Sequence, residues 1–141
     1  MKKLLISSII ANTVIFGITY SFIANMSSIT FAIMIYLLPL IYNVGATWFA
    51  SKKLSSKQLN QLFIGLPTIS TIFYYVFGLS MKNNSMWEMF INKNTMTSGS
   101  VSFSVGHNLI SPSQIIFIIA LYGCIEFLTK LVLKNKKLEV I

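Results

Sequence analysis

The sequence predicts an all-α integral membrane protein, a four-helix bundle forming a single membrane domain over residues 1–141. Three observations predict this class. Apolar residues make up 55% of the chain and charged residues only 10%, whereas ordinary soluble proteins are roughly 25% charged. Positions 4–51 contain no Lys, Arg, Asp, Glu or His, and a soluble domain of this size has too little interior to bury such a run. Four separate segments also approach the roughly 20 apolar residues that a bilayer crossing needs.

The four predicted spans cover residues 4–24, 29–50, 61–81 and 113–133. The letters NMSS at 25–28 separate the first two spans and are typical of a tight hairpin. The lysine-rich stretch 51–60 connects the second span to the third. A longer segment, 82–112, connects the third to the fourth.

The lysines predict the orientation of the bundle. With four spans, nine of the eleven lysines fall on one side, and only Lys82 and Lys93 fall on the other. Because cytoplasmic loops carry the excess of positive charge, we expect both termini in the cytoplasm and the 82–112 segment outside the cell membrane. Residues 1–24 also have the basic start and apolar middle of a signal peptide. Their apolar run exceeds the usual length of about 7–15 residues, so we expect a retained helix.

Six of the cytoplasmic lysines are candidates for contact with acidic partner proteins or anionic lipid. Lysines gather at the ends of apolar segments and not on a face interleaved with exposed aromatic residues, so direct nucleic-acid binding is not expected. The expected partners are the lipid bilayer, a membrane or cytoplasmic protein and, as an open alternative, further copies of the chain. The six candidates are Lys52, Lys53, Lys57, Lys134, Lys136 and Lys137.

Polar side chains from all four spans are predicted to meet at one depth. With a rise of about 1.5 Å per residue, they lie about 10–15 Å from the cytoplasmic boundary. This candidate polar layer comprises Asn12, Asn43, Thr68, Thr71 and Glu126. Small and polar residues spaced by four and three also predict the faces on which the spans contact one another. These faces are Ser8, Asn12, Ile15 and Thr19; Ala32, Tyr36, Pro39, Asn43, Ala46 and Ala50; Thr68, Thr71, Tyr75 and Gly78; and Tyr122, Glu126 and Thr129.

Glu126 permits two interpretations. An ionisable side chain inside a span is often functional, here as a proton or ion acceptor in a polar pocket. The structural interpretation pairs it with Lys130, four residues on, at the spacing of a helical ion pair. Both side chains would then reach toward the inner interface, or a protonated carboxyl group would bond to Asn12 or Asn43. We favour a structural role because Lys130 lies so close in the sequence.

The 82–112 segment is too long for a simple connection, so we expect local structure in it. The letters SMWEMFI at 85–91 predict a short helix lying in the membrane interface. SVSFSVG at 100–106 alternates as a small strand or extended lid would. Trp87, Phe90 and Phe103 are candidate contacts for an outer ligand or partner. A loop that only rests on lipid headgroups is the alternative.

The sequence contains none of the common catalytic motifs. It has no glycine-rich phosphate loop, no HExxH, no GxSxG and no paired aspartates. His107 is the only histidine and Cys124 the only cysteine, whereas a metal site needs several converging ligands. We therefore expect no enzyme, no cofactor and no metal.

A pattern that covers most of the chain begins with ISSIIANTVIFG at 6–17, with Ala11-Asn12 and Phe16-Gly17 as its core. Pro39 within the second span, IFYYV at 72–76 and a lysine-rich tail continue it. In these features the sequence resembles the Msa family of small staphylococcal membrane proteins, with the outer segment as the part that departs. The resemblance implies a signal-transducing membrane protein that modulates expression of a global regulator of virulence and biofilm formation. It implies no enzymatic activity and brings no established site residues.

The first functional prediction is therefore a membrane regulator without catalysis, which senses an envelope condition through 82–112 and acts through 51–60 and the tail. Two alternatives from other classes stay open. One is a bacteriocin-immunity protein or an accessory subunit of a membrane transporter. The other is a small proton-coupled transporter that depends on Glu126.

Overall fold

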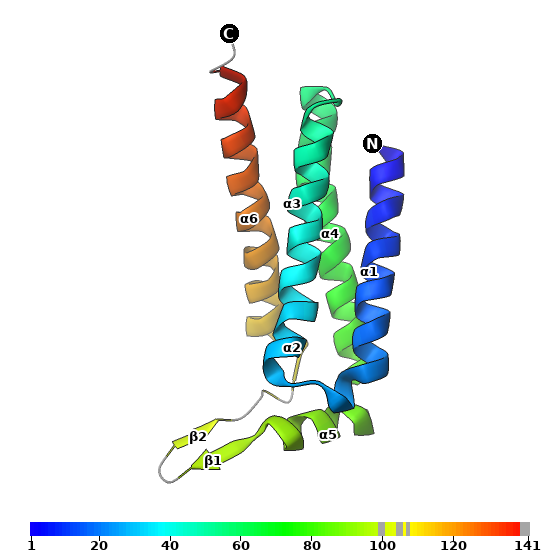
Figure 1. The fold of residues 1–141 in the computed structure, drawn as a ribbon, viewed down its shortest axis with the longest axis vertical. Helices are drawn as coiled ribbons and strands as arrows, with labels where there is room; N and C mark the ends of the chain where they lie inside the picture. The colour runs from blue at the N-terminus through cyan, green and yellow to red at the C-terminus, as the bar shows by residue number, and fades with distance from the viewer. Residues whose placement is uncertain (99–100, 104–105, 107, 139–141) are drawn as a thin grey trace.

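Four long helical segments lie side by side in the computed structural model, which describes residues 1–98, 101–103, 106 and 108–138 (Figure 1). The start of α1 (Lys2–Phe22), the turn between α3 (Leu38–Ser51) and α4 (Ser56–Met81), and the end of α6 (Pro112–Leu138) lie together at one end of the bundle. We call this the lysine end. The four segments are long and apolar enough to cross a membrane, as predicted. α1 and α6 each pack against α3 and α4.

The second segment stays helical from Ser28 to Ser51, but its middle is not α-helical. α2 (Ser28–Ala32) passes through a π-helical turn, η2 (Ile33–Leu37), into α3. Pro39 follows this turn almost at once, and a proline both lacks the backbone donor and crowds the carbonyl group four residues before it. The wider turn is a local adjustment that lets a long helix accommodate a proline.

Serine side chains define the starts of two helices. Ser27 follows the 3-10 turn η1 (Ile23–Asn25), and its hydroxyl accepts a hydrogen bond from the backbone N–H of Thr30 at 3.2 Å. Ser55 and Gln58 form a reciprocal capping box at the start of α4. The third long helix therefore begins at Ser56 and not near residue 61, so the predicted 51–60 connection is a short turn.

The end opposite the lysine end is closed by α5 (Ser85–Asn94), which lies across the bundle (Figure 1). We call this the α5 end. Asn83 has a φ of 61° in the turn between α4 and α5, a left-handed conformation that asparagine tolerates. β1 (Met96–Ser98) pairs antiparallel with β2 (Val101–Phe103), with Met96 opposite Phe103. The helix predicted at 85–91 is therefore present and longer than expected, and part of the 100–106 stretch is a strand.

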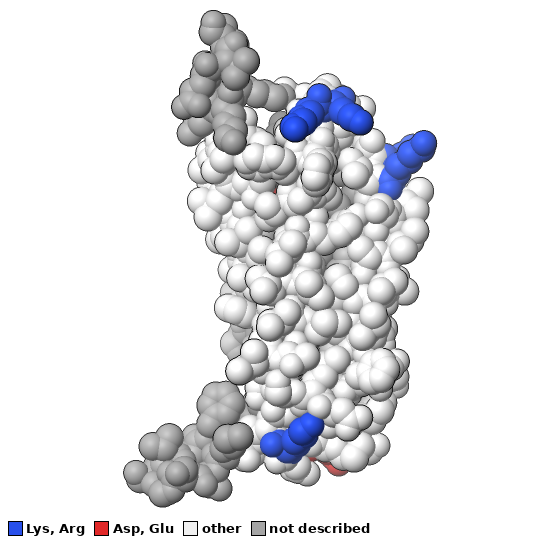
Figure 2. Space-filling view, in the orientation of Figure 1, with Lys and Arg blue, Asp and Glu red and all other residues white. Residues whose placement is uncertain are grey.

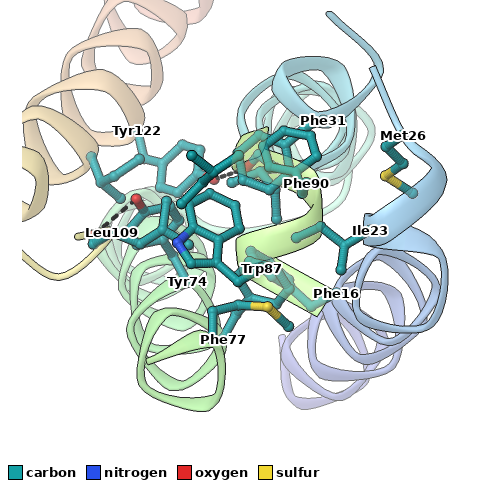
Figure 3. Packing of buried hydrophobic residues seen from close by; sticks show 14 residues of the cluster. Phe16, Ile23, Met26, Phe31, Tyr74, Phe77, Trp87, Phe90, Leu109 and Tyr122 are labelled. Atoms are coloured by element: carbon teal, nitrogen blue, oxygen red, sulfur yellow. Dashed lines mark hydrogen bonds between the residues drawn. The ribbon is translucent and has the colours of Figure 1, made fainter. Parts of the chain in front are cut away.

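The larger of two apolar cores lies near the α5 end. Five aromatic rings from α1, α2, α4 and α5 meet there, and neighbouring ring centroids lie 4.9–6.3 Å apart, a spacing at which aromatic pairs attract. We call these rings the aromatic cluster: Phe16, Phe31, Phe77, Trp87 and Phe90 (Figure 3). The smaller core, at the lysine end, contains Ala50, Leu59, Leu62 and Leu66.

Large apolar side chains also cover the outside of the bundle. Ile29, Phe49 and Ile64 are 74%, 73% and 72% exposed. Soluble monomers rarely expose extended apolar surface, whereas lipid tails solvate it. On the face drawn in Figure 2, lysine side chains appear only near the two ends of the molecule. This distribution of apolar and charged surface is typical of a bundle that crosses a membrane.

Candidate functional site

Buried polar side chains connect the spans, and α3 contributes to both pairs of buried side chains that are hydrogen-bonded between different long helices in the described residues. Asn43 Nδ2 donates to Ser70 Oγ on α4 at 3.1 Å. One helical turn further on, Thr47 Oγ1 donates to Glu126 Oε1 on α6. These two contacts place polar groups of three helices at neighbouring levels of the bundle. We call the buried polar side chains of the spans the polar set: Ser8, Asn12, Thr19, Asn43, Thr47, Ser70, Glu126 and Thr129.

Glu126 is the one acidic residue of the described chain that is buried, with 1% of its surface exposed. Its Oε1 accepts from Thr47, and its Oε2 has no hydrogen-bond partner. The predicted ion pair with Lys130 is wrong, because the ammonium group of Lys130 lies 5.6 Å from the centroid of the Phe63 ring instead. The physical reason is direction: Glu126 points between the helices toward α3, while Lys130, one turn nearer the helix end, lies against α4.

The predicted asparagine partners of Glu126 bond elsewhere. Asn12 Nδ2 donates to the backbone oxygen of Ser8 at 2.8 Å, within α1, and its Oδ1 has no hydrogen-bond partner. Asn43 is engaged with Ser70, as described above. Asn12 and Asn43 are nonetheless buried as predicted, at 0% and 2% exposure, so two helices do direct amide groups into the bundle.

The predicted contribution of α4 to the polar layer is wrong. Thr68 is exposed and donates to the backbone oxygen of Ile64 at 2.8 Å, within its own helix. Thr71 is half-buried, and Ser70 takes the place that the two threonines were expected to fill. The buried face of α4 is defined by apolar residues at spacings of three and four that continue through Ser70. Its members are Leu59, Leu62, Leu66, Ser70, Tyr74, Phe77 and Met81.

Two further members of the polar set could have been found from the same spacing. Thr47 lies four residues after Asn43 and three before Ala50, so it falls on the contact face already predicted for the second span. Ser70 lies four residues after Leu66 and four before Tyr74. The spacing of the apolar residues therefore indicated that Ser70 is buried. Thr68 and Thr71, on the same helix, offered an alternative polar face at a similar depth.

The outer aromatic candidates are not an exposed contact. Trp87 and Phe90 are 4% and 0% exposed, stacked on each other at 5.1 Å, and Phe90 lies 4.9 Å from Phe31 of α2. They are core residues because α5 directs these two side chains into the end of the bundle, beside Phe31 (Figure 3). Phe103 belongs to β2, and its side chain lies outside the described part of the structure.

Asn94, which the sequence analysis did not single out, fastens α5 to the turn between the first two spans. Its Oδ1 accepts from the backbone N–H and the hydroxyl group of Ser28 at 2.7 and 2.8 Å. Its Nδ2 donates to the backbone oxygens of Met26 and Phe90 at 3.2 and 2.9 Å. The neighbouring Lys93 donates to the backbone oxygen of Asn25 at 2.7 Å. We call these contacts the Asn94 clamp.

The cytoplasmic lysine candidates lie at the lysine end. Lys52, Lys53 and Lys57 are exposed around the turn between α3 and α4, and Lys134 is exposed on α6. Lys136 and Lys137 belong to the last turns of α6, and their side chains lie outside the described part of the structure. The structure therefore brings Lys52, Lys53, Lys57 and Lys134 to one end of the bundle.

The described residues contain no group of three or more His, Cys, Asp or Glu side chains able to hold a metal ion. Cys124 is exposed on α6, and His107 lies outside the described residues. The described residues therefore combine a tightly packed α5 end, a set of buried polar side chains between the spans and exposed lysines at the lysine end.

Comparison with protein-family models, with curated proteins and with solved structures finds no match. The resemblance to the Msa family stays a prediction that depends on the residues quoted for it.

Proposed function

We propose that the chain is a multi-pass protein of the cell membrane, with both termini in the cytoplasm. Its four long apolar helices and apolar exterior support insertion. The excess of lysine at the end where α1 starts and α6 ends supports the orientation. In this orientation α5 and the β-hairpin face outward, and the turn between α3 and α4 faces the cytoplasm.

Within the membrane the chain acts as a regulator that transmits the state of its outer segment, without catalysis. The observation that supports this most is the continuity between α5 and the spans. Trp87 contacts Phe31 at 5.5 Å, Phe31 contacts Phe77 at 6.3 Å, and Phe77 contacts Phe16 at 5.7 Å between ring centroids. Because closely packed interiors transmit displacement, a ligand or membrane condition that moves α5 also disturbs α1, α2 and α4.

The regulatory target follows from the resemblance to the Msa family, which implies control of virulence or biofilm gene expression. The lysine end supplies the surface that binds the partner protein. Exposed Lys52, Lys53 and Lys57 favour an acidic surface on a membrane or cytoplasmic partner protein.

A genetic experiment tests the proposal. Cells that lack the chain are compared, by sequencing their transcripts, with cells that carry the wild type, Asn94→Ala or Asn92→Ala. We expect loss of the chain to change virulence or biofilm transcripts. The wild type and Asn92→Ala, whose side chain is exposed, should restore them, while Asn94→Ala should not. Immunoblots of membrane fractions ensure that all variants are present in equal amounts.

Either of two results contradicts the proposal. Transcripts that are unaffected by loss of the chain remove the regulatory role. Full restoration by Asn94→Ala shows that attachment of α5 is not what transmits the signal. Lysine-reactive crosslinking in native membranes, followed by mass spectrometry, then identifies the protein that contacts the turn between α3 and α4.

A second candidate, a small proton-coupled transporter, is favoured by one observation, the buried Oε2 of Glu126 that has no partner. Proteoliposomes that enclose a pH-sensitive dye test it. Proton uptake by the wild type that Glu126→Gln abolishes supports transport. Equal signals from both proteins and from empty vesicles remove this candidate.

A further inference from the structure

An open groove lies between α4 and α6 at the lysine end. It has a volume of about 330 Å³, within the range of about 300–1,000 Å³ common for small-molecule sites. Its walls combine apolar and polar side chains in roughly equal number. The main lining residues are Leu59, Asn60 and Phe63 from the start of α4 and Lys130, Leu133 and Lys134 from the end of α6.

The groove lies where two of the four long helices approach the lysine end of the bundle. One wall includes the first turns of α4, which begins at Ser56, and the other includes Lys130 and Lys134 near the end of α6. Ser56 also lines the groove. In the proposed orientation these helix ends face the cytoplasmic side, where lipid headgroups are within reach of the lysines.

The positive charge of the groove is not neutralised by the nearest carboxyl group of α6. Glu126 lies one turn before Lys130, but its Oε1 accepts from Thr47 and its Oε2 has no hydrogen-bond partner. The ammonium group of Lys130 is held 5.6 Å from the centroid of the Phe63 ring, a cation–π contact that leaves its donors available. Lys134, one turn further along α6, is exposed beside the same groove.

We propose that this groove binds one anionic phospholipid. The phosphate group contacts Lys130 and Lys134, the glycerol region lies near Asn60, and an acyl chain covers Phe63 and Leu133. Charge complementarity selects an anionic headgroup, and basic pockets between helices on the cytoplasmic side are typical sites for such lipids. Free phosphate would satisfy the lysines but leave the apolar half of the groove uncovered, so the occupant is a lipid. The proposal does not depend on the regulatory role.

Titration of phosphatidylglycerol into the full chain in detergent, with bound lipid counted by native mass spectrometry, tests this site. We expect the wild type to bind one phosphatidylglycerol in preference to phosphatidylcholine. Lys130→Gln and Lys134→Gln should each weaken binding roughly fivefold, since a lysine near an anionic headgroup contributes on the order of 1 kcal/mol. The matched control is Lys2→Gln/Lys3→Gln, which removes two exposed lysines of the same end that do not line the groove. Circular dichroism verifies that every variant keeps its helix content.

Three results would overturn the proposal. Unchanged binding by Lys130→Gln/Lys134→Gln shows that the groove is not the site. An equal loss in the Lys2→Gln/Lys3→Gln control shows a general attraction to surface charge. Displacement of phosphatidylglycerol by inorganic phosphate at matched concentration shows that the groove recognises the phosphate group alone.

Discussion

The hydroxyl group of Tyr122 on α6 donates a hydrogen bond of 2.6 Å to the backbone oxygen of Ile35. Ile35 lies in the π-helical turn, four residues before Pro39. In a regular helix the N–H of residue 39 would bond to this oxygen, but proline has none to donate. Where no water is present, a buried carbonyl group needs another donor. Tyr122 supplies that donor from a neighbouring span, which ties the irregular second helix to the fourth.

Replacement of Tyr122 by Phe removes this donor and little else. We expect the free energy of unfolding to fall by about 1 kcal/mol, because the carbonyl group of Ile35 loses a hydrogen-bond donor in the bundle interior. Unfolding in mixed micelles at increasing denaturing detergent measures the change. Tyr75→Phe, on an exposed tyrosine of α4, is the matched control and should have no effect.

A double-mutant cycle isolates the role of Pro39. Pro39→Ala restores a backbone N–H at position 39, so Tyr122→Phe should be nearly neutral in that background. The same loss of stability with and without the proline would show that Tyr122 does not compensate for the missing donor.

The fold was predictable because hydrophobicity alone decides it. A run without ionisable residues from 4 to 51 has few alternatives to membrane spans, and the four segments are present close to the predicted bounds. The rotation of each helix is harder to predict. Thr68 is able to face outward because its hydroxyl group bonds within its own helix, so a threonine does not need a buried polar partner.

The partner of Glu126 was unpredictable for a related reason. Lys130 is close along the helix, whereas Thr47 is close only after α3 and α6 have packed. The i,i+4 spacing therefore predicted an ion pair with the charge nearest along the helix. It could not predict a contact between side chains of two different helices. The burial of Trp87 and Phe90 follows the same logic: their amphipathic spacing predicted a helix correctly, but it could not distinguish lipid headgroups from the end of the bundle as the surface that α5 covers.

Thr47 and Glu126 provide a second prediction. Thr47→Val removes the donor to Glu126 and leaves both carboxyl oxygens without a partner. We expect it to lower the free energy of unfolding by about 1–3 kcal/mol. The double variant Thr47→Val/Glu126→Leu replaces both partners by apolar groups and should be close to wild type.

Micelle unfolding of the wild type, both single variants and the double variant measures this coupling. Additive losses in the double variant would contradict a direct contact between the two side chains. Thr13→Val, on an exposed threonine of α1, is the control for the substitution itself.

Gly78 provides a third prediction, at the closest approach to α4 of the segment preceding α6. A methyl group added at Gly78 would lie 2.6 Å from Cγ2 of Ile110 and 3.4 Å from Cβ of Leu109. The same region is fixed by the hydroxyl group of Tyr74, which donates to the backbone oxygen of Leu109 at 3.0 Å. Gly78→Ala should therefore reduce stability by about 1–3 kcal/mol through overpacking.

Gly123→Ala on α6 is the control, because an added methyl group there meets no atom within 4 Å. Its stability should equal or exceed that of the wild type, since alanine favours a helix. Thermal unfolding in detergent compares the two variants. A Gly78→Ala protein as stable as Gly123→Ala would show that residues 109–110 move to accept the methyl group without loss of stability.

The Asn94 clamp provides the fourth prediction, for which the neighbouring Asn92 offers a matched control. Asn94→Ala removes the acceptor of two bonds from Ser28 and the donor of two bonds to Met26 and Phe90. Because four contacts of a side chain that is 8% exposed are lost, we expect α5 to open locally before the bundle unfolds. Hydrogen exchange of the α5 amides should accelerate by at least about tenfold, which corresponds to about 1.4 kcal/mol.

Asn92→Ala makes the same chemical change two residues earlier on an exposed position, and its α5 amides should exchange as in the wild type. Asn94→Asp separates the two halves of the clamp. It keeps the acceptor for Ser28 but cannot donate to Met26 or Phe90, so its exchange should lie between that of the wild type and Asn94→Ala. Exchange mass spectrometry in nanodiscs measures all three variants, with α1 amides near Phe16 as an internal reference for global unfolding. If the Asn94→Ala amides exchange at the rate of the Asn92→Ala amides, the aromatic cluster alone holds α5 in place, and the clamp contributes nothing to the coupling proposed for the outer segment.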